Sequence, residues 1–485
     1  MRYRHMPHDR GAAPPAPRPP AVFLGTLEVA GYYASLAVGL RALGVPVTYV
    51  DLGAHAFRYD APRQPRLAVR IGALTRRRMA TRGRAARAAL LAVEGAARVA
   101  LMAWAVARHR YFVFGYATTF LGRQALELRL LRLLGKRIVY VFHGSDSRPP
   151  YLDGATMAPD RGRTEDDCVA LTRAHRARVE VIDRWAHHVV ENPLDAHFHT
   201  RPLVSWFAVG VPVAAGESAP ASGAPAPGAP APGTPVRLLH CPSHPAAKGT
   251  DAIRAVVARL QGRGLPVEYV EITGRPNHEV LAAIDACDLV LDQLYSDTPL
   301  ASFATEAAQR GKPVLVGGYG ADHLARVAPP GSLPPSAYVH PDAFEATLER
   351  LVQDADARRA LAAELRTFVA THWAPESVAA RMMRLLSGGD VPAAWQFAPA
   401  SVVYCGGCAL PASRARALVR GVLERGGPDA LCVSDKPALR AALVRFADSG
   451  VLPGPMAAAA ETTTAGAAAA AASPAPVLPM AAVGC

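Results

Sequence analysis

In the stretch SDTPLASFATEAAQRGKPVL, residues 296–315, a carboxylate lies alone among alanines in the middle of a predicted helix, before a strand. Asp297 or Thr298 can cap the helix, and Pro299 suits its first turn. A helix that starts after a strand is an anion site, because its unpaired backbone amides and its dipole both attract negative charge. Glu306 would lie about 12 Å along the axis from position 298. The stretch therefore predicts a diphosphate at the helix start and ribose hydroxyl groups bound by Glu306 further along.

For both Glu306 and Lys248, a functional interpretation competes with a simpler structural one. A solvated helix residue is the simple alternative for Glu306, but alanines at the nearest helical positions imply close packing and favour a functional role. A second polar loop, HCPSHPAAKGTD at residues 240–251, follows another apolar run and carries Lys248. A lysine on a strand-to-helix loop can bind a phosphate as a point charge. A surface lysine is the alternative, although the whole chain has only four lysines.

Apolar runs typical of strands alternate along the chain with segments of helical periodicity, and these strands and helices must position the candidate residues. AVFLG, YYASLAVGLRAL and VPVTYVDL form a strand, a helix and a second strand within residues 21–52. Such a unit indicates a parallel sheet covered by helices. The alternation continues to the apolar run at 136–142, which ends in the tetrad HGSD, and it restarts after residue 235. The sequence therefore predicts an α/β protein with two doubly wound domains, in which the 296–315 helix start faces the crevice at the carboxyl edge of a sheet.

Composition marks where these domains begin and end. Residues 217–235, ESAPASGAPAPGAPAPGTP, have no means of packing and are expected to form a linker. The apolar runs SVVYCGG and ALCVSD near the C-terminus are predicted strands, each followed by a helix. The predicted division is a disordered N-terminus at 1–20, a first domain at 21–213, a Pro/Ala-rich linker at 214–235, a second domain at 236–388, a small α/β appendix at 389–452 and a disordered Ala-rich tail at 453–485.

The bulk properties exclude several classes of protein. The chain has 485 residues with 51% apolar content and a formal charge of +13, nearly all of it from Arg. Its polar, Pro-rich N-terminus lacks the apolar segment of a signal peptide. Seven cysteines are too few for a disulfide scaffold, and the Cys405–Cys408 pair lacks the two further ligands of a zinc site. We therefore expect a cytoplasmic protein without a metal, and no nucleic acid as partner, because no binding module accompanies the charge.

Positive charge concentrates in residues 63–110, which hold twelve arginines and one acid, Glu94. The apolar run Ala88–Ala107 within this segment carries Glu94 and Arg98 in its middle. Each of these charges is costly at the centre of a bilayer, so we expect a buried or interfacial helix rather than a membrane span. Three alternatives remain open for the segment: an anionic membrane surface, an anionic acceptor, or a solvated face of an Arg-rich chain.

On these features the chain resembles the two-Rossmann-domain (GT-B) glycosyltransferases, specifically the large retaining family 4. The resemblance covers roughly residues 21–387 and depends on an inter-domain hinge at AVGVPV, a strand and loop that end in Lys248-Gly249, and Glu306 followed by Gly311-Lys312-Pro313-Val314. It implies two Rossmann-like domains with a central cleft. It also implies donor binding by Ser243, Lys248, Gly249, Thr298 and Glu306, and a place for His143 and Asp297 beside the transferred sugar.

The resemblance implies a hexosyltransferase-like enzyme that moves a sugar from a nucleotide-diphosphate donor to a sugar, lipid-linked or small-molecule acceptor. Retention of configuration is expected, with the leaving phosphate assisting deprotonation of the acceptor and with no cofactor or metal. The family's first acid would fall at Thr298, one place after Asp297, which favours the alternative of a non-catalytic nucleotide-sugar-binding or scaffold protein. A nucleotide-sugar epimerase of the same fold is a weaker third interpretation.

Overall fold

The structure, a computed structural model, describes residues 20–53, 63–213 and 234–455. In this part of the chain a seven-stranded sheet has the strand order β12-β6-β5-β4-β3-β1-β2. Its strands are parallel except for β12 at the edge. β1 and β3 are buried along their whole length, as expected for strands covered on both faces. The strands are β1 (Val22–Thr26), β2 (Val47–Asp51), β3 (Tyr111–Gly115), β4 (Arg137–Val141), β5 (His188–Glu191), β6 (Leu203–Ser205) and β12 (Gln396–Phe397).

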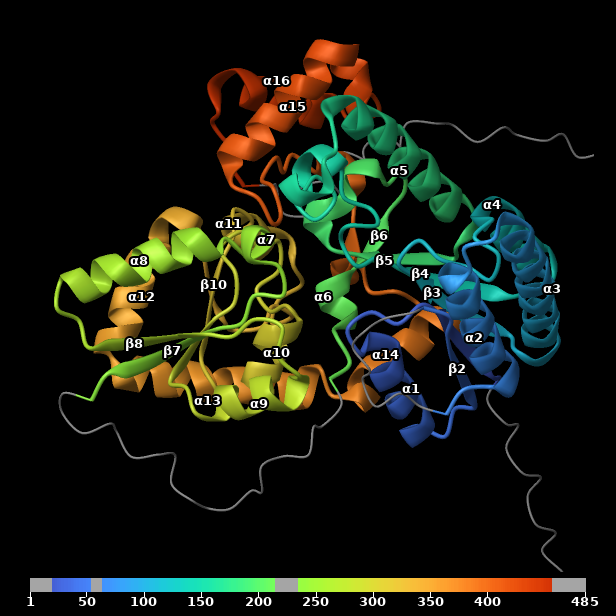
Figure 1. The fold of residues 1–485 in the computed structure, drawn as a ribbon, viewed down its shortest axis with the longest axis horizontal. Coiled ribbons are helices and arrows are strands. Elements are labelled where there is room, and N and C mark those ends of the chain that lie inside the picture. The colour runs from blue at the N-terminus through green and yellow to red at the C-terminus, as the bar shows by residue number, and fades with distance from the viewer. Residues whose placement is uncertain (1–19, 54–62, 214–233, 456–485) are drawn as a thin grey trace, which may run out of the picture.

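The second sheet has five strands in the order β11-β10-β9-β7-β8, all parallel. Figure 1 shows the two sheets in separate lobes. The predicted fold of two doubly wound α/β domains is therefore confirmed. The predicted N-terminal segment, linker and tail lie almost wholly outside the described residues. The strands of the second sheet are β7 (Val236–His240), β8 (Val267–Glu271), β9 (Leu289–Leu291), β10 (Val314–Gly317) and β11 (Ala337–Val339).

Amphipathic helices cover both sheets. In α12, the buried residues Phe344, Leu348, Leu351 and Val352 recur at the spacing of one helix face. They pack in the core of the second domain. The covering helices are α1 (Tyr32–Ala42), α4 (Gln124–Leu133) and α5 (Glu165–Trp185) in the first domain, and α8 (Thr250–Gly262), α9 (Asn277–Asp285), α10 (Ser302–Gln309), α11 (Ala321–Val327), α12 (Phe344–Gln353) and α13 (Ala355–His372) in the second.

Helix α14 (Pro375–Ser387) lies against the first domain, although the predicted second domain extends to residue 388. Its apolar face packs on α1 in one continuous core. The approach is close, since a Cβ added at Gly39 of α1 would lie 2.0 Å from the carbonyl oxygen of Pro375. The chain therefore crosses back between the domains. Periodicity predicted which face of α14 is buried, but it could not predict the partner surface.

The two C-terminal segments predicted as strands, SVVYCGG and ALCVSD, are not strands. This region instead holds helices α15 (Ala412–Gly426) and α16 (Pro437–Ser449), which share a core with the first domain. The two residues directly after SVVYCGG bond with distant segments: the Cys408 amide donates to the Leu152 carbonyl (2.9 Å), and the Ala409 amide donates to the Tyr295 carbonyl (2.7 Å). The segment around Cys408 thus contacts both domains.

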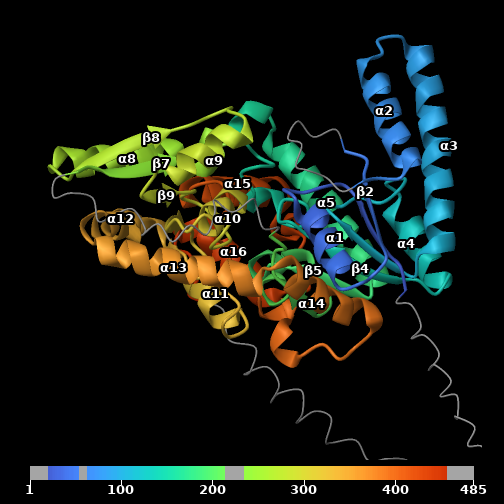
Figure 2. The ribbon, with the colours of Figure 1, turned by 90° about the horizontal axis from the view of Figure 1, so that it is seen from below.

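Helices α2 (Arg66–Ala80) and α3 (Arg84–Arg108) form a hairpin that projects from the first domain (Figure 2). Of the two predicted alternatives for the apolar run, a buried helix is wrong, because only 22% of its most apolar window is buried. By length and composition alone, α3 is the one helix in the described part of the chain that could cross a membrane.

Candidate functional site

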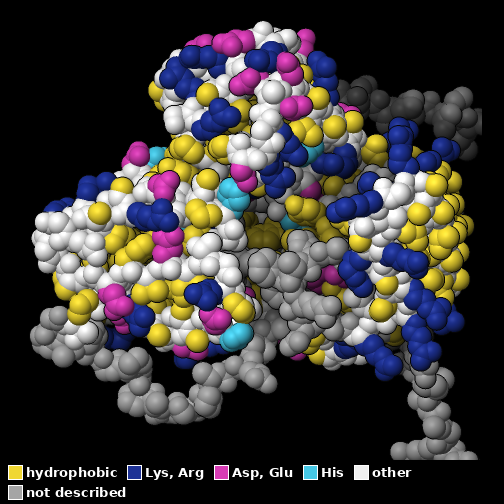
Figure 3. Space-filling model, viewed as in Figure 1, with side chains coloured by type: hydrophobic (Ala, Val, Ile, Leu, Met, Phe, Trp, Pro, Cys, Tyr) yellow, Lys and Arg dark blue, Asp and Glu magenta, His cyan; other side chains and the backbone are white. Residues whose placement is uncertain are grey.

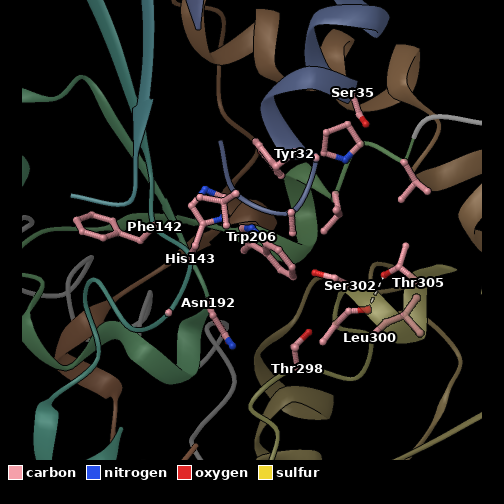
Figure 4. A pocket seen from close by; sticks show the side chains of 18 of the residues that line it. Tyr32, Ser35, Phe142, His143, Asn192, Trp206, Thr298, Leu300, Ser302 and Thr305 are labelled. Atoms are coloured by element: carbon pink, nitrogen blue, oxygen red, sulfur yellow. Dashed lines mark hydrogen bonds between the residues drawn. The ribbon is translucent and has the colours of Figure 1, made fainter. Parts of the chain in front are cut away.

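A cavity of about 340 Å³ lies between the two domains, within the range of small-molecule sites. Its walls come from the carboxyl ends of β4, β5 and β6, the start of α1, and the segment around α10. Figure 4 shows Thr298 and Ser302 of the second domain across from Trp206 and Asn192 of the first. Loops at the carboxyl edge of parallel strands are where ligands bind in α/β folds, so the topology itself places the cavity.

His143 follows β4 and lines the cavity, and its place beside a transferred sugar stays a prediction. Its Nε2 lies 3.0 Å from the Tyr33 hydroxyl, and its ring packs edge-on against Tyr32 and Tyr33. Burial lowers the pKa of His143 to about 3. The imidazole is therefore neutral at physiological pH, and it can orient a hydroxyl group but not donate a proton as a cation.

The start of α1 also borders the cavity, but it already has an internal anion. Glu28 accepts hydrogen bonds from the amides of Val29 (2.8 Å), Tyr33 (3.2 Å) and Ala34 (2.9 Å). Burial raises the pKa of this carboxyl group, although those amide bonds oppose the change. The helix dipole and free amides of α1 are thus satisfied by the protein itself.

The start of α10 on the opposite wall has no such cap. The helix begins at Ser302, so the predicted start near Pro299 is wrong by three residues. Residues before it form a loop held by Ser296, whose hydroxyl accepts from the Thr298 amide (3.1 Å) and donates to the Thr298 carbonyl (2.7 Å). Neither Asp297 nor Thr298 caps the helix, because the N-cap residue is Ala301.

The uncapped start of α10 leaves the first-turn amides available to an anion. Ala301 and Ser302 line the cavity. Two buried hydroxyl groups of the same lining, on Tyr32 and Thr298, have no hydrogen-bond partner among the described residues. Tyr32 is only 3% exposed. Unpaired polar groups in a buried wall are costly, which indicates a polar ligand.

Glu306 lines the cavity one helical turn, roughly 6 Å, beyond Ser302. Burial raises its pKa to about 7, against the opposing effects of Arg310 and a hydrogen bond with Asn277. The carboxylate is thus partly desolvated and ready to accept hydrogen bonds from a ligand. The prediction placed the helix start near position 298, about 12 Å from Glu306. Because the helix starts at Ser302 instead, Glu306 lies closer to the helix start than predicted.

Asp297 lies at the cavity wall, but its carboxylate is engaged. Arg148 donates to Asp297, to both oxygens of Asp195 (3.0 and 2.9 Å) and to Asp153 (3.0 Å). Asn192 Nδ2 also donates to the Asp297 carbonyl (2.8 Å). Burial raises the pKa of Asp195 to about 7, while Arg148 opposes the change. Asp297 therefore joins the domains rather than presenting a free acid to the cavity.

Three predicted donor-binding residues, Ser243, Lys248 and Gly249, do not line this cavity. Ser243 is exposed. Lys248 Nζ lies 3.1 Å from the buried carboxylate of Asp292, and 17% of its side chain is exposed. Gly249 has φ +70°, and a Cβ there would lie 2.9 Å from the Leu294 Cβ, so glycine is required by packing. Their role in donor binding stays a prediction.

Sequence reasoning missed several residues of the site. Asn192 follows β5, Trp206 follows β6, and Tyr32 begins α1, so each lies at the carboxyl edge of the first sheet. A polar or aromatic residue directly after a short apolar run was the signal that could have found Asn192 and Trp206, whereas Tyr32 begins a helix and gave no such signal. Arg148, five residues after His143, gave no such signal, because two of its three acidic partners, Asp195 and Asp297, are distant in sequence. Within the described residues no group of His, Cys, Asp and Glu could hold a metal ion.

No protein-family model matches the chain, and no curated protein matches it in sequence. Among solved structures, HepE of Anabaena, in complex with UDP and glucose, is similar over 76% of this chain and 99% of its own, with 11% identity and a TM-score of 0.38. Starch synthase IV of Arabidopsis thaliana, bound to ADP and acarbose, covers 76% and 98%, with 11% identity and a TM-score of 0.44. The glycosyltransferase SnogD of Streptomyces nogalater covers 76% and 99%, with 16% identity and a TM-score of 0.35.

Proposed function

We propose that the chain is a glycosyltransferase that moves a sugar from a nucleotide-diphosphate sugar to a sugar, lipid-linked or small-molecule acceptor. One observation carries the proposal: the uncapped start of α10 and Glu306, one turn along, line the same cavity between two parallel sheets. The amides at that start would hold the diphosphate, and Glu306 would accept hydrogen bonds from the ribose. The donor sugar would then point toward His143 and Asn192 in the first domain.

The proposed transfer forms a bond between an acceptor oxygen and the anomeric carbon, and it breaks the bond from that carbon to the diphosphate. The acceptor hydroxyl gives its proton to the departing phosphate oxygen, so the protein need not supply a strong base. Configuration would be retained. The neutral His143 would orient a sugar hydroxyl group, and Asp297 would act through its bond with Arg148, which fixes the cavity wall. No metal or cofactor takes part in the proposed step.

A second candidate function is donor binding without turnover. It is favoured by the engagement of Asp297 with Arg148 and by Thr298 at the place of the family's first acid. The two candidates share the donor site and differ only in the transfer step. Release of a nucleoside diphosphate from a bound donor, in the presence of sugar acceptors, separates them.

The proposal is tested by a thermal-shift panel of UDP, GDP and ADP sugars on the full chain, followed by nucleotide-release assays. We expect one nucleotide class to raise the melting temperature, and Glu306→Gln to weaken that shift. Glu424→Gln, on the exposed side of α15, is the matched control and should behave as wild type. Unchanged melting with all three nucleotide classes would rule out both candidates, and binding that persists undiminished in Glu306→Gln would remove this acid from the site.

A cytoplasmic location and peripheral contact with a membrane are also part of the proposal. The cysteines within the described residues are all free, which suits a reducing compartment. An acceptor held in or near a membrane would suit a protein whose first domain carries exposed apolar helices. Fractionation of expressing cells into cytosol, membrane and secreted material tests the location.

A further inference from the structure

Helix α3 exposes an apolar face to solvent. From residue 88 to residue 107, every exposed position is Ala, Val or Leu. Leu91, Val93 and Val99 are 57%, 54% and 54% exposed. The face runs for roughly 30 Å along the helix. A surface helix of a soluble protein normally turns its polar face outward, so this pattern is inverted and implies that another apolar phase covers the face.

The two charged residues in the middle of α3, Glu94 and Arg98, point inward and fix its orientation. Glu94 is 3% exposed and accepts hydrogen bonds from Thr75 (2.9 Å), Arg78 (2.7 Å) and Arg98 (3.0 Å). Arg98 also donates to the Phe120 carbonyl (3.1 Å). Turning the helix to bury its apolar face would break this buried cluster. The exposed apolar face is therefore a fixed feature of the hairpin.

The C-terminal half of α3 is anchored in the first domain. Leu101, Met102 and Ala105 are buried in the domain core. A helix that crossed a bilayer would have to leave this core and carry Glu94 and Arg98 into hydrocarbon, where charges are costly. The geometry thus favours a helix that lies along a membrane surface over one that spans it.

Helix α4 extends the apolar surface. Leu126, Leu130 and Leu133, at the spacing of one helix face, are 60%, 40% and 73% exposed. Figures 1 and 2 both show α4 beside the part of α3 nearest the domain body. In Figure 3, hydrophobic side chains form a continuous edge over α3, with Lys and Arg side chains beside it. The exposed apolar area is therefore a surface shared by two helices.

Arginines surround this surface without acidic partners. Arg82, Arg84 and Arg87 are exposed at the hairpin tip, and Arg76 and Arg77 are exposed on α2. The only acid between residues 63 and 110 is Glu94, which is buried and paired. A second copy of the chain would bring the same arginines against each other, which disfavours a dimer through this face.

We propose that the apolar face of α3, extended by Leu126, Leu130 and Leu133 of α4, docks on the surface of an anionic lipid bilayer. The apolar side chains would enter the boundary between headgroups and acyl chains, and the arginines would contact the lipid phosphates. Both contributions are needed, since neither apolar burial nor charge alone gives stable binding. This docking specifies the membrane contact of the proposed function, but it does not depend on donor binding, so vesicle binding and donor binding can each fail without the other.

Flotation of the full chain with vesicles tests the proposal. We expect binding to phosphatidylcholine vesicles that contain about a third phosphatidylglycerol, weak binding to pure phosphatidylcholine, and loss of binding at high salt. Leu91→Glu/Val99→Glu should abolish flotation. Replacing Arg82, Arg84 and Arg87 with Glu should lower the affinity for anionic vesicles at least about 100-fold, because each charge contributes a factor of about five or more. Val451→Glu is the matched control, because Val451 is an exposed apolar residue (70%) away from the hairpin.

A second measurement reports insertion directly. In a Leu91→Trp variant, lipids with brominated acyl chains should quench the new fluorescence, because the side chain enters the acyl boundary. Equal binding to neutral and anionic vesicles would overturn the charge argument. A dimer in solution that Leu91→Glu/Val99→Glu converts to a monomer would show that a second copy covers the face, and it would overturn the proposal. Thermal unfolding of each variant confirms that the exposed substitutions leave the fold intact.

Discussion

Arg148 of the first domain and Asp297 of the second form an ion pair between the domains, at the wall of the cavity. The same guanidinium also binds Asp153 and Asp195, so three buried carboxylates share one cation. Asn192 adds a second bond across the gap, from its amide to the Asp297 carbonyl (2.8 Å). These bonds thus fix the loop before α10 relative to the carboxyl ends of the strands in the first sheet.

Replacing Arg148 should destabilise the protein strongly. Arg148→Met leaves three carboxylates buried without a counter-charge, and we expect a loss of about 3–5 kcal/mol in the free energy of unfolding. Asp297→Asn keeps the other two partners of Arg148 and should cost much less. Urea unfolding measures both values. If Asp297→Asn also increases the radius of gyration in small-angle scattering, the ion pair holds the domains together; an unchanged radius would assign that role to other contacts.

Donor affinity should depend on pH through Glu306. Burial raises the pKa of this carboxyl group to about 7, so it is increasingly protonated, and a poorer acceptor, below that pH. If the ribose binds the ionised form, affinity should fall about 30-fold from its plateau when the pH is lowered to 5.5. Calorimetric titration with the nucleotide sugar, whose doubly esterified diphosphate does not titrate in this range, measures the change. Glu306→Gln should remove the dependence; persistence of the same profile would point to Asp195, whose pKa is also raised to about 7.

Lys248 and Asp292 allow a structural role to be separated from donor binding. Lys248→Met leaves the fully buried Asp292 carboxylate unpaired and should reduce the free energy of unfolding by roughly 2–4 kcal/mol. Adding Asp292→Asn should restore much of that loss. If donor affinity recovers in the double variant, Lys248 is structural. If stability recovers while donor binding stays lost, the predicted contact of Lys248 with the diphosphate is correct.

His199 should make stability fall at alkaline pH. Burial opposes its protonation, but Asp183 (2.8 Å) and Glu191 raise its pKa to about 9 from an ordinary value of 6.5. The stabilisation is complete below pH 6.5 and is lost as the pH rises through about 9. Its size is on the order of 3 kcal/mol. Unfolding in urea between pH 6 and 10 measures it, and His199→Asn should flatten the curve; a wild-type curve that is flat over this range would refute the assignment.

The sequence predicted the two α/β domains because their signals are local. A strand buried on both faces needs a short apolar run, and a covering helix needs one apolar stripe, whatever its partner. The same signals failed for an apolar run that is buried without forming a strand. SVVYCGG is buried against the first domain without joining a sheet. The helix start near Pro299 was misplaced because Ser296 holds the preceding loop through its side chain.

The sequence by itself determined the residue types that reach the cavity from the end of β4 and from the segment around α10, among them His143, Thr298 and Glu306. Only the tertiary structure decided that Arg148 binds Asp297, that Lys248 pairs with Asp292 away from the cavity, and that α3 turns Glu94 and Arg98 inward. Backbone preferences and periodicity depend on near neighbours in the chain. Ion pairs and the burial of an apolar face depend on which residues distant in sequence come into contact. The packing of the whole molecule determines those contacts.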